Sequence, residues 1–389
     1  MNFERADDGL APWAQRGSLT RGRRHPEREH AYRPPYARDR DRIIHCRAFR
    51  RLEYKTQVFV FHEGDHYRNR LTHSIEVAQI GRTVARALGL EPDLVESLSL
   101  SHDLGHTPFG HLGEDVLSPL LADEGGFDHN RQTLRIVELL EERYPEFPGL
   151  NLTWEVREGI VKHSGPPDTA HWPEAVEYLP DVPPPLEAQI IDIVDEIAYN
   201  HADLEDGFES KLLDPLRLAE DVPLFGAPYH DATREYPGAD SWMWIKIALR
   251  RVIDRLVTDL VTATGRRLLE RGIRSVDDLR AGGEWLAGLS EPMAAENRRL
   301  KEHLGATLYS HPRIVEVKSM LGGVLVELFE VYVERPGEMP PRFRRRIDQA
   351  GPRRAAADYL AGMTDRYALL EHQRLCGGPG PAGIPFATR

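Results

Sequence analysis

The apolar residues of this chain recur mainly at helical spacing. Leu71 is followed by His73, Val77, Ile80, Val84 and Leu88, of which the last five stand three or four positions apart, and Gly89 comes next. This spacing places them on one face of a helix, and a glycine after the last of them is typical of a helix end. Similar stripes occupy residues 95–102, 134–140, 186–198, 245–260 and 317–331. The pattern predicts an all-α fold.

Strand-type alternation is not convincing anywhere in the chain, and two common phosphate-binding loops are missing from the sequence. There is no GxGxxG segment after a strand and no GxxxxGK[ST] segment. A doubly wound sheet with a nucleotide at its edge is therefore not expected. Any phosphate chemistry must use other groups.

The helical stripes and the composition divide the chain into four parts. Residues 1–40 are rich in Arg, Pro and Tyr and predict an extended arm that packs on the body or on a neighbour. Residues 41–210 are expected to form a helical core, and residues 211–375 a C-terminal helical region packed on it. Residues 376–389, rich in Gly and Pro, predict a flexible tail.

Charge and cysteine content narrow the function classes. With 50 basic and 62 acidic residues the net charge is -12, which argues against general binding to nucleic acids or membrane surfaces. No long apolar run predicts a membrane span or a signal peptide. Cys46 and Cys376 are far apart and lack zinc-site spacing, so we expect neither a disulfide framework nor structural zinc. A cytoplasmic location is expected.

Four potential metal ligands lie on predicted helices at positions that otherwise face the core. A single histidine on an apolar stripe is usually a hydrogen-bonded core residue. Here two histidines accompany two carboxylates, whose uncompensated burial costs on the order of several kcal/mol. A divalent cation would remove that cost, and the donor set suits Mn or Mg, with Fe, Co or Ni also possible. The predicted ligands are His73, His102, Asp103 and Asp195.

Several other side chains are spaced so that they can face the same site. Arg70 stands one helical turn before His73, so its guanidinium can reach phosphate oxygens beside a metal. Asp195, Tyr199 and Asp203 are four residues apart and share one helix face. By its residue type alone, Tyr199 could equally be a core aromatic.

The segment SHDLGHTPFGH, residues 101–111, carries three histidines. Its first histidine and the following aspartate belong to the predicted metal site. His106 and His111 follow on a turn shaped by Gly and Pro, which can direct side chains at a substrate. His111 and His129 could also be surface loop histidines.

Six blocks in order resemble a known enzyme family. They are FRRLEYKTQV (49–58), RNRLTHS (68–74), HDLGHTPFGHLGE (102–114), FDHN (127–130), DEIAYNHADLEDG (195–207) and AGMTDRYAL (361–369). Together they are similar to the HD-domain deoxynucleoside triphosphate (dNTP) triphosphohydrolases, the dGTPase-like family. The resemblance implies that residues 41–210 are a metal-dependent HD phosphohydrolase core. It also implies hydrolysis of a dNTP at the α-phosphorus, which yields a deoxynucleoside and inorganic triphosphate.

The resemblance implies a role for each matching residue. Proton transfer falls to His111, oriented by Glu114, and to His129. Phosphate contacts fall to Arg70 and His106, with Lys55 and Arg366 as weaker candidates; Asp365 and Arg366 could instead form an ion pair. Contacts to the deoxyribose fall to Gln57, Tyr199 and Asp203.

Two alternatives stay open at this stage. Another HD enzyme, acting on nucleoside monophosphates or cyclic nucleotides, would use the same four metal ligands. A protein that senses dNTPs without turnover belongs to a different class. The resemblance further implies a homo-oligomer, a hexamer in many relatives, and a dNTP activator bound between subunits.

Overall fold

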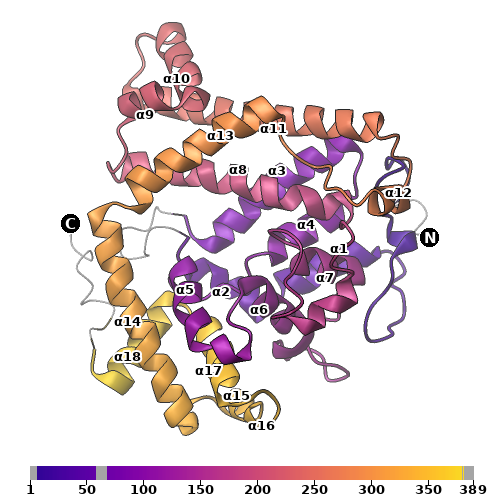
Figure 1. Cartoon of the computed structure of the whole chain (residues 1–389), viewed down its shortest axis with the longest axis vertical. Helices are drawn as coiled ribbons and strands as arrows, with labels where there is room; N and C mark the ends of the chain where they lie inside the picture. Colours follow the sequence, from indigo (N-terminus) through magenta and orange to yellow (C-terminus); the bar gives the residue numbers. More distant parts are fainter. Residues whose placement is uncertain (1–6, 58–67, 379, 381–389) are drawn as a thin grey trace.

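The computed structural model describes residues 7–57, 68–378 and 380. Within these ranges the predicted all-α class is confirmed, because the regular elements are helices and the β-structure is limited to two isolated bridges, Arg23–Thr153 and Thr56–Asn69 (Figure 1). Two helical segments have π geometry, Ile136–Leu140 and Gly305–Tyr309.

The α-helices follow one another along the whole of the described chain. They are α1 (Pro35–Ile44), α2 (Arg47–Arg51), α3 (Arg70–Leu88), α4 (Pro92–Ser101), α5 (His111–Leu120), α6 (His129–Arg135), α7 (Trp154–Val161), α8 (Leu186–Glu209), α9 (Pro215–Asp221), α10 (Pro223–Glu235), α11 (Ser241–Glu270), α12 (Val276–Ala281), α13 (Glu291–Leu304), α14 (Pro312–Glu334), α15 (Pro341–Arg344), α16 (Ile347–Ala350), α17 (Pro352–Ala361) and α18 (Asp365–Cys376). Short 3₁₀ segments occupy Gly17–Leu19, Leu52–Tyr54, Ala122–Glu124, Pro173–Tyr178 and Pro336–Glu338.

Helices α3, α4 and α8 form the centre of the core, and α11 packs on α3 and α8. A capping box between Asn69 and Thr72 fixes the start of α3, and Gly89 ends it with φ of 69°. Apolar residues of the predicted stripe, such as Val77 and Val84, are fully buried. Burial of this face holds three helices together, and the predicted metal ligands come from the same helices or from residues that directly follow them.

The described part of the N-terminal arm packs on the body. The Trp13 indole donates a hydrogen bond to the Leu88 carbonyl (3.1 Å), and the Gln15 amide donates to Glu187 (3.0 Å). The arm is shorter than expected, because α1 begins at Pro35 and Pro34 precedes it as the cap. At the other end, α18 continues to Cys376, and most of the predicted tail, 376–389, lies outside the described residues.

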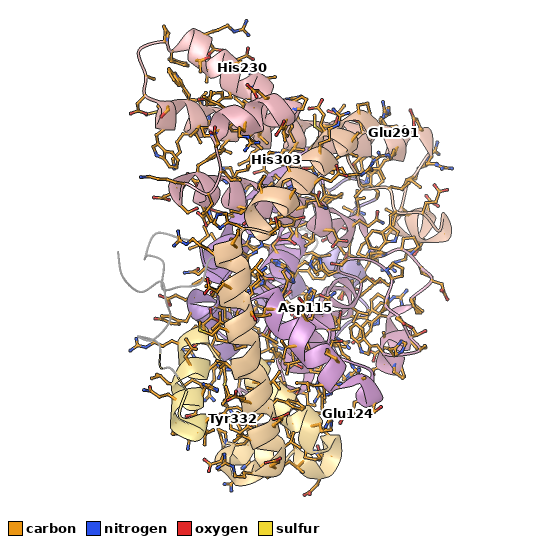
Figure 2. The ribbon with its side chains drawn as sticks, turned by 60° about the vertical axis from the view of Figure 1, so that its left-hand side comes forward. Asp115, Glu124, His230, Glu291, His303 and Tyr332 are labelled. Atoms are coloured by element: carbon orange, nitrogen blue, oxygen red, sulfur yellow. The ribbon has the colours of Figure 1, made fainter. Side chains whose placement is uncertain are left out.

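A second apolar cluster joins the C-terminal helices to α5. Leu117 of α5 is buried with Leu328 of α14, Leu360 of α17 and Leu369 of α18. Figure 2 shows α14, which carries Tyr332, running beside α5. The C-terminal region therefore positions α5, whose first residue is His111. Among the described helices, none combines the length and apolar character needed to cross a membrane.

Candidate active site

A cavity of about 480 Å³ gathers most of the predicted site residues. This volume is in the range of small-molecule sites. The cavity is lined by Gln57, Arg70, Asp103, His106, Phe109, His111, His129, His163, Ser164, Asp195, Tyr199, Asp203, Tyr309 and Lys318. These residues come from α3, α5, α6, α8 and α14 and from the segments between helices. Residues spread over most of the chain thus meet at one place.

The four predicted metal ligands lie close together, and two of them, Asp103 and Asp195, line this cavity. Asp195 Oδ1 is 2.7 Å from His73 Nε2 and 3.6 Å from His102 Nε2, and His102 Nε2 is 3.4 Å from Asp103 Oδ1. His73, His102 and Asp103 are nearly or fully buried and offer ligand atoms within 4.8 Å of one another. These three form the group that could hold a metal ion, and Asp195 joins it through its contacts with both histidines.

The chemistry of these donors fits a divalent cation. The Ser99 carbonyl lies 2.7 Å from His102 Nδ1 and so fixes a proton on that nitrogen, which directs the Nε2 lone pair at the two carboxylates. His102 Nε2 and Asp103 Oδ2 are buried without a hydrogen-bond partner among the described residues. Burial alone would lower the pKa of His102, but Asp103 and Asp195 raise it to about 9. The pocket therefore strongly favours positive charge.

Arg70 and His106 lie beside the ligand Asp103. Arg70 Nη1 donates to Asp103 Oδ1 (2.7 Å), while Arg70 Nε and Nη2 are buried without a described partner. Burial, followed by the charge of Arg70, holds the pKa of His106 well below its usual range. His106 is therefore a neutral imidazole, and Arg70 has two free donors for an anionic substrate.

Glu114 is paired with His129, whereas the sequence predicted a pairing with His111. The Glu114 Oε2 atom lies 2.9 Å from His129 Nδ1. Burial alone would lower the pKa of His129, but the hydrogen bond and charge of Glu114 keep it above the usual value. His111 has no such partner among the described residues, and burial and Arg70 lower its pKa. The difference arises because the start of α6 meets the first turn of α5, a contact that sequence spacing cannot show.

Two glycines shape the backbone around this contact. A Cβ on Gly105 would lie 2.1 Å from the His129 carbonyl oxygen, so only glycine lets the segment after Asp103 contact the start of α6. Gly110 and the preceding Phe109 both have positive φ, 69° and 64°. The Phe109 amide donates to Asp365 (2.9 Å), which stabilises this strained turn just before His111.

The predicted sugar contacts also line this cavity. Tyr199 and Asp203 line it from α8, together with Gln57, whose Oε1 is buried without a described partner. The hydroxyl of Tyr309 donates to Asp203 Oδ2. Burial raises the pKa of Asp203 to about 7, although this hydrogen bond lowers it. This part of the cavity therefore offers hydrogen-bond acceptors from Gln57 and Asp203 and the aromatic ring of Tyr199.

Two residues predicted to contact phosphate, Lys55 and Arg366, do not line the cavity. Lys55 Nζ donates to the carbonyls of His106 and Ala361 (2.8 Å to Ala361), so it connects two backbone segments and does not line the cavity. Arg366 is exposed and is not among the described residues that line the cavity. Its neighbour Asp365 is buried and accepts from Thr56 and Phe109, so the alternative of an ion pair with Arg366 is not seen among the described residues.

Five residues that line the cavity have no role predicted from the sequence: Phe109, His163, Ser164, Tyr309 and Lys318. His163 lies 5.4 Å from His102 between ring centroids, and its Nδ1 is 2.6 Å from Asp192 Oδ1. Tyr309 belongs to the π segment after α13, and Lys318 is exposed on α14. The VKHSG segment marks His163 as a histidine near a helix end, but no local pattern marks Tyr309 or Lys318 as cavity residues.

Comparison with known proteins identifies the family. The HD domain model matches residues 70–200, and the phosphohydrolase-associated domain model matches residues 287–374. A deoxyguanosinetriphosphate triphosphohydrolase-like protein of Geobacter sulfurreducens is 48% identical over 375 residues, 96% of each chain. A protein of the same description from Thiobacillus denitrificans is 46% identical over 370 residues, 95% of this chain and 98% of its own.

The similarity extends over nearly the whole length of both relatives, so it covers the cavity and the C-terminal helices as well as the core. HD domains bind divalent metal ions, which agrees with the histidine and aspartate cluster described above. The chain therefore belongs to the deoxyguanosinetriphosphate triphosphohydrolase-like family and is a phosphohydrolase of the HD-domain type.

Proposed function

We propose that this protein hydrolyses a dNTP to a deoxynucleoside and inorganic triphosphate, by attack of water on the α-phosphorus. The observation that carries the proposal is a single cavity lined by both predicted metal ligands and predicted sugar contacts. Relatives described as deoxyguanosinetriphosphate triphosphohydrolase-like share 44–48% identity with this chain and support the substrate class.

A divalent cation held by the four ligands would polarise a phosphoryl oxygen and lower the pKa of water. Arg70 would bind the phosphate oxygens with Nε and Nη2, because Nη1 is engaged by Asp103. The neutral His106 would donate a further hydrogen bond. Lys318, at the exposed edge of the cavity, would neutralise charge on the outer phosphates.

Cleavage at the α-phosphorus leaves an alkoxide at the 5′-oxygen of the sugar, which must take up a proton. His129 suits this role because Glu114 stabilises its protonated form and because it lines the cavity. His111 also lines the cavity, 5.2 Å from His106 between ring centroids. We assign proton donation to His129 with Glu114, and to His111 a contact with the substrate.

Asp203 would accept a hydrogen bond from the 3′-hydroxyl of the deoxyribose, and Gln57 would contact the same hydroxyl. Tyr309 already donates to one oxygen of Asp203, which leaves the other oxygen for the sugar. The ring of Tyr199 would pack against C2′ of the sugar. A 2′-hydroxyl of a ribose would clash with the ring or lose its hydrogen bonds to water there. This arrangement favours deoxyribonucleotides.

Product analysis tests the proposal. The four dNTPs are incubated alone and mixed, with Mn or Mg, and the products are separated by ion-exchange chromatography. Inorganic triphosphate and deoxynucleoside are expected. Pyrophosphate with a deoxynucleoside monophosphate would refute cleavage at this bond. Turnover of monophosphates or cyclic nucleotides alone would favour the other HD activity, and dNTP binding without any product would favour a sensor.

Assembly and regulation extend the same proposal. We propose a homo-oligomer, with a hexamer as the specific expectation, and a dNTP activator bound between subunits. The expected compartment is the cytoplasm. Light scattering with and without dNTP measures the assembly, and a monomer under both conditions would contradict it.

A further inference from the structure

A second cavity, away from the candidate active site, carries arginines without acidic partners. It has a volume of about 330 Å³ and lies among α2, α15, α17 and α18. The last three helices lie together at the lower end of the view in Figure 1. Arg51 and Arg342 line it, and no carboxylate is among its described lining residues. The cavity is therefore positively charged.

Neither arginine has an acidic side chain as a direct partner, although Glu141, Glu142 and Asp358 line an adjoining cavity with both. In the described part of the chain, neither forms an ion pair within 4.0 Å, and Arg342 Nε is buried without a partner. Burial, followed by the charge of Arg342, lowers the pKa of Arg51. The acid that acts on Arg51, Glu141, accepts instead from the Ala48 amide (2.8 Å). Two mutually repelling guanidinium groups in one cavity are stabilised by an anion.

The other walls suit a phosphate group. Thr364 lines the cavity and is the N-cap of α18, a helix of 12 residues, so the positive end of this helix is at the same site. The aromatic residues Phe343, Tyr359 and Tyr367 also line it, and the two tyrosine hydroxyls are 2.9 Å apart. Because one hydroxyl proton is used in this hydrogen bond, the other hydroxyl can donate to an oxyanion, and the rings offer an apolar surface beside it.

We propose that this cavity, defined by Arg51, Arg342 and Thr364, binds a phosphate group. The bidentate donors of two arginines match the oxygens of phosphate, and the aromatic walls would contact whatever the phosphate carries. The ligand can be an inorganic phosphate or the phosphate of a nucleotide. The site lies outside the metal centre, and none of its lining residues lines the candidate active site.

Binding is measured by isothermal titration calorimetry on the full chain, with EDTA present so that turnover does not interfere. The probes are inorganic triphosphate, inorganic phosphate and adenosine monophosphate. The variants are Arg342→Gln and Arg51→Gln, with Arg344→Gln as the matched control, because Arg344 is exposed on the same short helix α15 and does not line the cavity. Arg70→Gln reports binding in the active-site cavity.

Loss of a charge-assisted pair should weaken triphosphate binding about tenfold in Arg342→Gln and in Arg51→Gln. Arg344→Gln should bind as the unmodified protein does. Arg342→Lys should be intermediate, because lysine keeps the positive charge but lacks the paired N–H donors of the guanidinium group.

Equal affinities in Arg342→Gln and Arg344→Gln would overturn the proposal, as would binding that disappears entirely in Arg70→Gln. Tighter binding of the monophosphate than of inorganic phosphate would identify a nucleotide source, and the reverse would identify a free phosphate. No outcome depends on the proposed hydrolysis.

Discussion

Replacing Glu114 with glutamine should weaken the proton-donating form of His129. The Glu114 carboxylate lies 2.9 Å from His129 Nδ1, and the pKa of His129 is raised while that of Glu114 is lowered. Both shifts indicate an ion pair that stabilises the protonated imidazole. Glutamine has nearly the same shape and keeps one oxygen acceptor, but it lacks the negative charge and carries an NH2 group in place of the second oxygen.

The size of the effect follows from the kind of hydrogen bond. A bond that involves a charged group contributes about 1.5–3 kcal/mol and a neutral one about 0.5–1.5 kcal/mol. The substitution therefore removes about 1–1.5 kcal/mol of stabilisation from protonated His129. This corresponds to a loss of roughly 5- to 15-fold in kcat/KM at pH values where the imidazole of the variant is mostly neutral.

The assay is the pH dependence of kcat/KM for triphosphate release. Activity that requires protonated His129 is present below the pKa of this group and is lost as pH rises through it. Because the substitution lowers that pKa, the loss should begin at lower pH in Glu114→Gln. Asp115→Asn is the matched control, since Asp115 is the next residue on α5, is exposed and does not line the cavity (Figure 2).

A double-mutant cycle distinguishes the two histidines. Glu114→Gln should be strongly non-additive with His129→Ala and additive with His111→Ala, because only His129 contacts Glu114. The reverse pattern, or an equal shift in Asp115→Asn, would refute the pairing.

Three further changes test other parts of the site. Tyr309→Phe removes a hydrogen bond that lowers the pKa of Asp203, so the rise of kcat/KM with pH, expected near about 7 as Asp203 ionises, should move to higher pH in a pH profile. Asp103→Ala should abolish both metal content by elemental analysis and turnover, whereas His129→Ala should keep the metal and lose rate. Asp365→Ala removes the acceptor of the Thr56 amide, the Thr56 hydroxyl and the Phe109 amide. The free energy of unfolding measured in urea should therefore fall by about 3–6 kcal/mol.

The sequence was sufficient for features that depend on local spacing. The end of α3 follows from Gly89, and the structure places it where the pattern predicted. The helix starts at Arg70, one residue before the predicted stripe. The position of Asp195, Tyr199 and Asp203 along one face of α8 follows from the same helical geometry, and all three line the cavity. A helix of known period fixes such directions before any tertiary contact forms.

Features that depend on how distant segments meet could not be predicted. The spacing of His111 and Glu114 allows a contact, but the carboxylate bonds to His129 because Gly105 lets α6 approach closely. Tyr309 contacts Asp203 although the two residues are 106 positions apart in the sequence. Tyr309 lies in a π-helical segment, and no sequence pattern marks this segment. Such pairings are set by tertiary packing and not by periodicity.

Lys55 and Asp365 show why a residue in a recognisable block need not touch the substrate. Lys55 stands two residues before Gln57, yet its buried Nζ connects the carbonyls of His106 and Ala361. Asp365 connects Thr56, next to Gln57, with Phe109, two residues before His111. Each side chain therefore ties a segment that carries a cavity residue to the C-terminal helices. Because both groups satisfy buried backbone partners, their substitution should disturb the position of Gln57 and His111 even though neither contacts the cavity.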